Sequence, residues 1–431
     1  MKGMIVMKRT SVAVRTIIHF LILTMLLAML PLGSLAEGEP QKITMLFSAG
    51  GSGKAIAAAA ERFTAETGIE TEVLLFSLNE VYEKQILSLS NGTDDIDIVA
   101  INDPWVPLLK DYLDPLDLDQ AMLDAFIPGM LNTFAVDGVI YGIPVRMGGD
   151  VITYREDVLE ELGVDPASLR TWEDIYQLAL RLTDKDNSKY GWSMGLVEPS
   201  NVVKAWYEYL ICYGGYIINE TEDGLGLTQP EAIEATKMFV KFVQDCCPPD
   251  VLSYSFNDQV DSMKAGQAAM GLLWTSRYPS VNVEGSEGYG QWAVLPFMPG
   301  PEDGSLESGV ACVDGWAVGI SKYSSNKEAA RAFVEFIGSY DEQLRLATEN
   351  SNSPTIAAIY DAPEYLAVIP QAENMNLALE VSTPRPQKVY FNDIQEEIAL
   401  YIKLACLGDM TVEEALATCE ENCLEILESY R

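Results

Sequence analysis

Short apolar runs alternate with amphipathic stretches near the start of the chain. The apolar run Ile43–Phe47 predicts a buried strand. A helix is expected over Lys54–Thr67, ended by Gly68, and an extended segment over Ile69–Phe76. Another buried strand is expected over Ile96–Ile101. This alternation is typical of a parallel sheet covered by helices, so the pattern predicts an α/β fold.

Three later helices are predicted by capping boxes, in which Ser or Thr is followed three residues later by a carboxylate. The pairs are Thr171 with Asp174, Ser325 with Glu328, and Thr411 with Glu414. Pro230 suits the first turn of a helix that continues to Val243. Gly, Ser and Pro gather over Gly285–Ser308, which indicates exposed connections.

The first residues have the pattern of a secretory signal peptide. A leader with several Lys and Arg residues precedes the apolar run Ile17–Leu30, and the small residues Ser34 and Ala36 follow. We expect a signal peptide over residues 1–36, with cleavage after Ala36 and export from the cytoplasm. An uncleaved anchor is the alternative, but the apolar run is shorter than the roughly 20 residues that span a bilayer.

The chain is strongly acidic, with a net charge of −36, and the leader carries none of the 64 acidic residues. Such a charge repels nucleic acid and anionic lipid headgroups, so neither is an expected partner. The length predicts two domains, each with its own core.

Histidine and cysteine limit the chemistry. The one histidine, His19, lies in the leader. Nucleophiles that need a histidine base and imidazole-bound zinc are therefore excluded, and no cofactor or metal is expected. The seven cysteines form no C-x-x-C pair. Cys419 and Cys423 share the apolar stripe of a helix, which predicts buried thiols, while the pairing of Cys246 and Cys247 stays open.

The segment Gly50–Lys54 follows a strand and has the glycines of a phosphate-binding loop. That motif needs glycine in place of Ser48 and a hydroxyl residue in place of Ala55. A flexible turn beside a ligand cleft is the better interpretation, and its backbone amides could still bind a solute.

From about Lys42 onward, several short motifs occur in the order found in one family. They are Asp137–Pro144 (DGVIYGIP), Ile152–Asp157 (ITYRED), Thr171–Asp174 (TWED), Met263–Met270 (MKAGQAAM) and Gly315–Lys322 (GWAVGISK). In these motifs the chain resembles the family 1 extracellular solute-binding proteins, which include the maltodextrin-binding proteins. One departure is that the first cysteine is Cys212, so the lipid-modified cysteine that often follows the signal peptide in this family is missing.

The resemblance implies a type II clamp of two α/β lobes, each a central sheet flanked by helices, joined by hinge crossings. The lobes would comprise residues 37–147 with 297–352, and residues 148–296 with 353–431. The crossings are expected near Arg146–Gly149, where two glycines permit rotation, near Leu295–Phe297, and near Asn352–Thr355.

Aromatic planes and planar polar groups are what a sugar site needs, and such residues fall where this fold would place the cleft. The candidates are Ser48, Asp103, Trp105, Arg146, Asp150, Tyr213, Trp274, Arg277, Asp314, Trp316, Arg385 and Tyr390. Other roles remain open, because a tryptophan could be a core residue and Asp103 could cap a helix. Arg146 and Asp150 could instead pair with each other.

The expected function is capture of a mono- or oligosaccharide and its delivery to the permease of an ABC importer, by a monomer without enzymatic activity. The same clamp could bind a polyamine, a phosphate ester or a metal complex, or could report to a sensor kinase. A secreted glycoside hydrolase with two carboxylates is the alternative from another class.

Overall fold

The computed structural model describes residues 41–219, 224–302, 309–350 and 352–430. Lys42–Arg431 forms one compact unit, and the account below concerns this unit. The expected signal peptide, residues 1–36, lies outside the described residues, as do residues 303–308 of the expected exposed connection. Within the described ranges, no helix combines the length and the apolar character that crossing a membrane requires.

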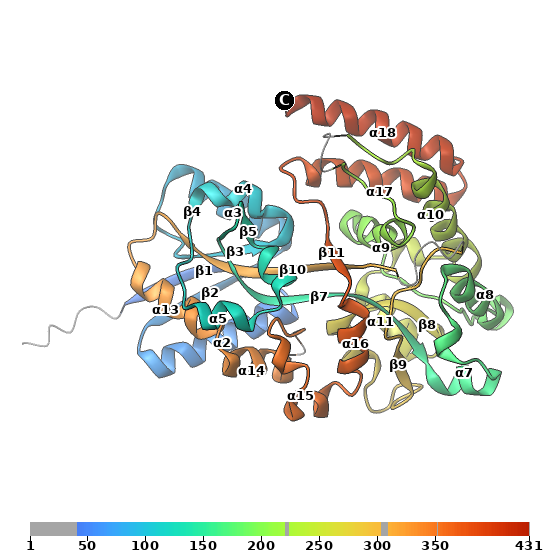
Figure 1. Cartoon of the computed structure of the whole chain (residues 1–431), viewed down its shortest axis with the longest axis horizontal. Coiled ribbons are helices and arrows are strands. Elements are labelled where there is room, and N and C mark those ends of the chain that lie inside the picture. The colour runs from blue at the N-terminus through green and yellow to red at the C-terminus, as the bar shows by residue number, and fades with distance from the viewer. Residues whose placement is uncertain (1–40, 220–223, 303–308, 351, 431) are drawn as a thin grey trace, which may run out of the picture. The chain divides into compact units, whose positions relative to one another are not determined.

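A mixed sheet runs through the unit in the order β2-β1-β3-β10-β7-β8, and β4, β9 and β11 pair beside this path (Figure 1). Its strands are β1 (Lys42–Ser48), β2 (Glu70–Phe76), β3 (Ile98–Asn102), β4 (Leu113–Asp114), β7 (Ile143–Arg155), β8 (Met270–Trp274), β9 (Trp292–Val294), β10 (Ala311–Ser321) and β11 (Ser382–Pro384). A separate hairpin joins β5 (Ala135–Val136) to β6 (Val139–Ile140).

The expected parallel pairing is confirmed for the first strands, and the later strand β10 joins the sheet antiparallel. Strand β1 is parallel to β2 and β3, as the alternating pattern predicts. Strand β10, however, enters the sheet antiparallel to both β3 and β7. Strand β10 comes about 200 residues after β3 in the sequence. Its direction is therefore not set by a local alternation of strand and helix.

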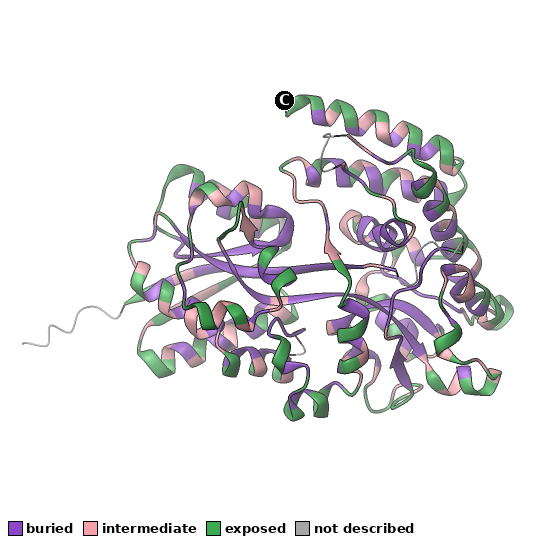
Figure 2. Ribbon diagram, in the orientation of Figure 1, coloured by how far each residue is buried: buried purple, intermediate pink, exposed green. Residues whose placement is uncertain are grey.

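Strands β7 and β10 belong to both halves of the unit. The first part of β7 pairs with β10, and Asp150–Arg155 pairs with β8 and β9. All eleven residues of β10 are buried. The two strands therefore form a continuous buried ladder between the half built on β1–β3 and the half built on β8 and β9 (Figures 1 and 2).

The helices of the first half flank β1–β3. They are α2 (Gly51–Thr67), α3 (Leu78–Asn91), α4 (Val106–Leu109), α5 (Gln120–Ala125), α6 (Pro128–Asn132), α13 (Lys327–Ile337) and α14 (Tyr340–Asn350). Helix α2 ends where expected, because Gly68 takes the left-handed conformation with φ 76°. Outward faces of these helices are exposed, while β3 and most of β1 are buried (Figure 2).

The remaining helices are α7 (Glu156–Leu162), α8 (Trp172–Leu182), α9 (Pro199–Cys212), α10 (Pro230–Lys241), α11 (Phe256–Lys264), α12 (Tyr278–Val281), α15 (Pro363–Val368), α16 (Ala372–Leu379), α17 (Phe391–Leu407) and α18 (Val412–Ser429). Helix α9 is buried from Val202 to Cys212 and packs against α10, α17 and β10. A cluster of stacked and edge-on rings, including Trp172, Tyr209 and Phe242, fills the core beside it.

The capping boxes at Thr171 and Thr411 are confirmed. The box at Ser325 is wrong, because α13 begins at Lys327 and has no side-chain cap. The neighbouring Ser324 accepts from the Asn326 N–H instead and donates to Asp97. The helix that begins at Pro230 is confirmed, and after Lys241 it continues as a π-helical turn over Phe242–Cys246.

Crossings of the chain between the halves differ from expectation in two ways. Gly148 and Gly149 lie inside strand β7, and neither has a positive φ. A Cβ atom at Gly148 would lie 2.5 Å from Oγ1 of Thr275, so glycine is needed there for space rather than for rotation. The chain does not leave the second half at Leu295–Phe297. The Gly300 carbonyl, further along, still accepts a hydrogen bond from the Trp172 N–H in that half. That return crossing occurs later, within β10.

The segment Asn352–Thr355 lies against β7, as a crossing would. Thr355 Oγ1 donates to the Pro144 carbonyl, and the hydroxyls of Thr275 and Ser353 are 2.7 Å apart. The cysteines are buried and unpaired throughout the described part of the chain. This confirms the buried thiols expected for Cys419 and Cys423, whose sulfurs are 3.9 Å apart.

Candidate functional site

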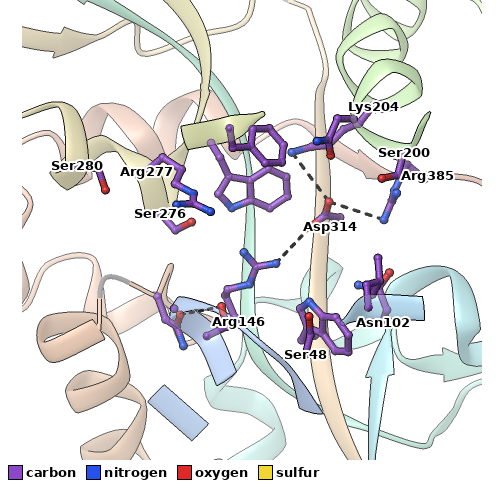
Figure 3. Close-up of a pocket in the computed structure, with 18 residues that line it drawn as sticks. Ser48, Asn102, Arg146, Ser200, Lys204, Ser276, Arg277, Ser280, Asp314 and Arg385 are labelled. Atoms are coloured by element: carbon purple, nitrogen blue, oxygen red, sulfur yellow. Dashed lines mark hydrogen bonds and ion pairs between the residues drawn. The ribbon is translucent and has the colours of Figure 1, made fainter. Parts of the chain in front are cut away.

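A cavity of about 380 Å³ opens where the two halves face each other across β7 and β10 (Figure 3). The first half and the crossing strands contribute Ser48, Gly51, Ser52, Leu78, Asn102, Arg146, Asp314, Trp316 and Asn352. The second half contributes Ser200, Asn201, Lys204, Phe256, Trp274, Ser276, Arg277, Ser280 and Arg385. The lining is mostly polar and carries few aromatic rings, which is the composition of a site for a small polar ligand.

Asp314 lies at the centre of the charged groups. Its Oδ1 atom is 3.6 Å from Nη2 of Arg146. Its Oδ2 atom is 3.7 Å from Nη2 of Arg385 and 3.9 Å from Nζ of Lys204. Three cations from three different elements therefore surround one carboxylate at distances longer than a hydrogen bond (Figure 3).

The end of β3 holds the backbone beside Asp314 in place. Asn102 Nδ2 donates to the Gly315 carbonyl at 3.0 Å, and the Gly315 N–H donates to Asp103 Oδ1 at 3.4 Å. A Cβ atom at Gly315 would lie 2.4 Å from the Arg146 carbonyl oxygen. Glycine at this position thus lets β10 approach β7 closely, with Asp314 and Trp316 on either side of it.

Two more carboxylates lie behind the lining cations. Asp103 accepts from Arg385 at 3.1 Å, and Asp150 pairs with Lys204 at 3.0 Å. Burial raises the pKa of Asp103 to about 6, against the opposing effect of Arg385. Burial also raises the pKa of Asp150, and Lys204 opposes the shift.

Glu208, one helical turn after Lys204 on α9, is also fully buried. Its Oε2 atom accepts from the Cys312 N–H at 2.8 Å. Burial raises its pKa well above the ordinary value, and the charge of Asp150 adds to the shift. Burial therefore favours the neutral form of Glu208 more than it would for an exposed glutamate.

We call Phe47, Tyr82, Trp105 and Trp316 the aromatic wall. The Trp316 ring lies 4.9 Å from Phe47 and 5.4 Å, edge-on, from Trp105. Tyr82 packs against Trp105 at 5.1 Å. Only Trp316 of these four lines the cavity, and the other rings fix its position from behind.

We call Arg146, Lys204, Trp274 and Arg277 the cationic wall. Nζ of Lys204 lies 2.8 Å from the centre of the Trp274 ring, and Cζ of Arg146 lies 5.2 Å from it. Both contacts are cation–π interactions. Arg277, on the short 3₁₀ turn Thr275–Arg277 after β8, contacts Asn257 at 3.4 Å.

The structure brings most of the expected site residues together. Ser48, Arg146, Trp274, Arg277, Asp314, Trp316 and Arg385 line the cavity. Asp103, Trp105 and Asp150 lie one layer behind it, where they pair with or support lining residues. The alternative pair of Arg146 with Asp150 does not form, because Asp314 and Lys204 are their partners.

Two expected residues lie elsewhere. Tyr213 follows α9 and donates to Glu302 in a separate hollow on the second half. Tyr390 packs against Tyr430 at the start of α17, with ring centres 5.9 Å apart. Neither lines the cavity.

Sequence reasoning missed several lining residues, and Lys204 matters most among them. It lies on α9, whose other inward positions are almost all apolar. The signal was present, because Lys204 and Glu208 are four residues apart in an apolar helix and buried charges need partners. Ser200, Asn201 and Asn352 carried no comparable signal.

Comparison with known proteins places these features in a family. The sequence model of the bacterial extracellular solute-binding proteins matches residues 49–344. A probable ABC transporter-binding protein of Deinococcus radiodurans is 25% identical over 298 residues, which cover 67% of this chain and 69% of the relative. A probable amino-acid ABC transporter periplasmic-binding protein of Sinorhizobium fredii is 23% identical over 342 residues, covering 77% and 76%.

Among solved structures, maltose-bound MalE3 of T. maritima superimposes with a TM-score of 0.78 at 25% identity, covering 88% of this chain and 98% of that one. The expected two-lobed α/β fold is thereby confirmed. The matching sequence model spans more than half of the chain. This chain belongs to the bacterial extracellular solute-binding proteins and is a solute-binding protein of the ABC transporter type.

Proposed function

We propose that the solute is a carbohydrate, a mono- or oligosaccharide bound between the two lobes and delivered to the permease of an ABC importer. The observation that carries this proposal is the composition of the cavity, in which Trp316 and Trp274 stand among hydroxyl, amide and guanidinium groups. Sugars combine apolar faces with hydroxyl edges, and this mixture complements both. The maltose bound by the T. maritima neighbour supports the same class of solute.

Binding without catalysis is part of the proposal. Glycoside hydrolysis needs two carboxylates on opposite sides of the scissile bond. Among the described residues that line the cavity, Asp314 is the one carboxylate, and its neighbours are cations. This arrangement favours capture over hydrolysis.

The lobes of the proposed clamp meet within β7 and β10, with the third crossing near Asn352–Thr355. A solute that contacts Trp316 on one side and Arg277 on the other is held fully only when the lobes close, so binding shifts the equilibrium toward the closed form. The protein is proposed to act as a monomer, exported to the outer side of the cytoplasmic membrane, where the permease receives the closed form.

A thermal-shift screen of the purified protein tests the solute class. The panel contains monosaccharides, oligosaccharides, polyols, amino acids, polyamines and phosphate esters. A ligand at 100 times its Kd adds about 2.7 kcal/mol to the free energy of unfolding, which raises Tm by a few degrees. A response confined to sugars and polyols supports the proposal. A response confined to amino acids or polyamines overturns the carbohydrate assignment.

A further inference from the structure

The charge of the cavity is opposite to the charge of the protein. The whole chain carries −36, yet four of the lining residues are cations and one is an anion. The cations are Arg146, Lys204, Arg277 and Arg385, and the anion is Asp314. Because the rest of the surface is acidic, this local excess is a property of the site and not of the overall composition.

Ion pairs with carboxylates neutralise three of the four lining cations and leave one cation without such a partner in the described part of the chain. Arg385 pairs with Asp103, and Lys204 pairs with Asp150. Arg146 takes the remaining carboxylate, Asp314. Arg277 forms no ion pair with any described residue, and its one hydrogen-bond partner there is the Asn257 amide at 3.4 Å.

Arg277 has also lost much of its contact with water. Its side chain is partly buried, and this burial lowers its pKa. Burial lowers the pKa of Arg146 as well, and the charge of Arg277 acts in the same direction. In Figure 3 both groups reach into the same part of the cavity. Asp314 contacts Arg146 but not Arg277, so the two guanidinium groups together can receive a second anion.

Unused donors surround the same space. Nε of Arg146, Nε1 of Trp274 and Nδ2 of Asn352 are buried and have no hydrogen-bond acceptor among the described residues. The N-termini of α2 and α9 also face the cavity through Ser52 and Ser200, and their free backbone N–H groups favour an acceptor or a negative charge. These donors remain free for acceptors on a solute, while unpaired oxygens of Asp103 and Asp150 lie behind the lining cations.

We propose that the solute is an acidic carbohydrate with one carboxylate, of the uronate type, and that Arg277 and Arg146 bind the carboxylate. This inference rests on the proposed function and specifies its substrate class. One uncompensated cation matches one negative charge, which favours a carboxylate over a phosphate ester with its larger charge. The carboxylate also offers two oxygens in the planar geometry that a guanidinium fork prefers.

Matched pairs of sugars test the inference by isothermal titration calorimetry on the full protein. The probes are D-galacturonate with D-galactose, D-glucuronate with D-glucose, and digalacturonate with galactobiose. At least one acid should bind about tenfold or more tightly than its neutral partner, since a charge-assisted hydrogen-bond pair contributes that much. Neutral members that bind as tightly as the acids overturn the inference and leave the carbohydrate proposal standing.

A charge variant assigns the preference to the site. Arg277→Gln should remove the preference for the acid, so that the acid and its neutral partner bind with nearly equal affinity. The protein should still fold, since Arg277 pairs with no carboxylate in the described structure. Arg181→Gln, which removes the same charge from the exposed surface of α8, should keep the preference. An acid preference that survives Arg277→Gln contradicts the inference.

Glutamate and inorganic phosphate complete the experiment as anions without a sugar. Tight binding of either, with none of the sugars bound, overturns both the acidic-sugar inference and the carbohydrate proposal. Binding of a uronate with no response to glutamate or phosphate supports both.

Discussion

The aromatic wall and the cationic wall face the same cavity but are held in place by different forces. Trp316 is fixed by rings packed behind it, at 4.9 Å and 5.4 Å. Trp274 is fixed by charged groups, with the Lys204 ammonium 2.8 Å from its ring centre. The same residue type is therefore a packed apolar surface on one side and part of a charged network on the other.

This difference indicates which wall determines which property of the ligand. The rings behind Trp316 place an apolar plane at the cavity, and an apolar plane accepts any sugar face of suitable size. The cationic wall discriminates by charge, because an unpaired charge in a partly buried site is costly. We expect breadth of binding to depend on the first wall and selectivity on the second.

The largest expected effect is on stability, from removing the charge of Lys204. Its side chain and that of Asp150 are 4% and 5% exposed. Lys204→Met leaves Asp150 buried without its partner and should lower the free energy of unfolding by about 3–5 kcal/mol, measured by urea denaturation. The double variant Lys204→Met/Asp150→Leu removes both charges and should recover most of the loss. A double variant as unstable as the single one contradicts this account of the cationic wall.

The next effect is on binding and compares the two tryptophans directly. Replacing either Trp316 or Trp274 by Ala should weaken sugar binding by about 1–3 kcal/mol, measured by calorimetry with the best ligand from the screen. The loss of affinity should be larger for Trp316→Ala, because the Trp274 ring is already in contact with Lys204 and Arg146. Trp316→Phe retains a ring and serves as the control for folding. A larger loss at Trp274 would reverse the assignment of the two walls.

The smallest effect is the pH dependence that Glu208 contributes. Its pKa in the folded protein is raised well above 4.5, mainly by burial. The folded state thus holds a proton that the unfolded state has released, so the free energy of unfolding falls as pH rises from about 4.5 toward the raised pKa. Glu208→Gln keeps the hydrogen bond from Cys312 and cannot titrate.

Urea denaturation of both proteins at pH 5 and pH 8 measures this contribution. The wild type should lose more stability than Glu208→Gln between the two pH values. Equal losses would mean that Glu208 is ionised in the folded protein.

Sequence reasoning succeeded for the fold where the signal was local. The apolar run at β1, the glycine that ends α2 and the capping box at Thr171 each act within a few residues. The direction of β10 could not be read in this way, because its pairing with β3 joins residues more than 200 positions apart. The later return crossing was missed for the same reason, since the pairing of Trp172 with Gly300 fixes it.

For the site, residues beside strand ends and glycines were predictable, and Asp314 and Trp316 are examples. The same reasoning misplaced Tyr213, which lines another hollow. The ion pairs could not be predicted from the sequence. The pair of Arg146 with Asp314 and the pair of Lys204 with Asp150 depend on how β7, α9 and β10 pack together. That Arg277 forms no ion pair among the described residues can be recognised only after those pairs are known.

The ladder between β7 and β10 contains one extra residue. Trp316 pairs with Arg146, and the next residue, Ala317, pairs with Pro144, so Val145 has no partner on β10. Side chains alternate along a strand, and one extra residue changes which positions face the cavity on either side of it. Deleting Val145 would remove the extra residue, so the segments of β7 before and after it could no longer both keep their present faces. The length of β7 therefore helps to decide which side chains face the cavity, and a one-residue deletion or insertion there should change its lining.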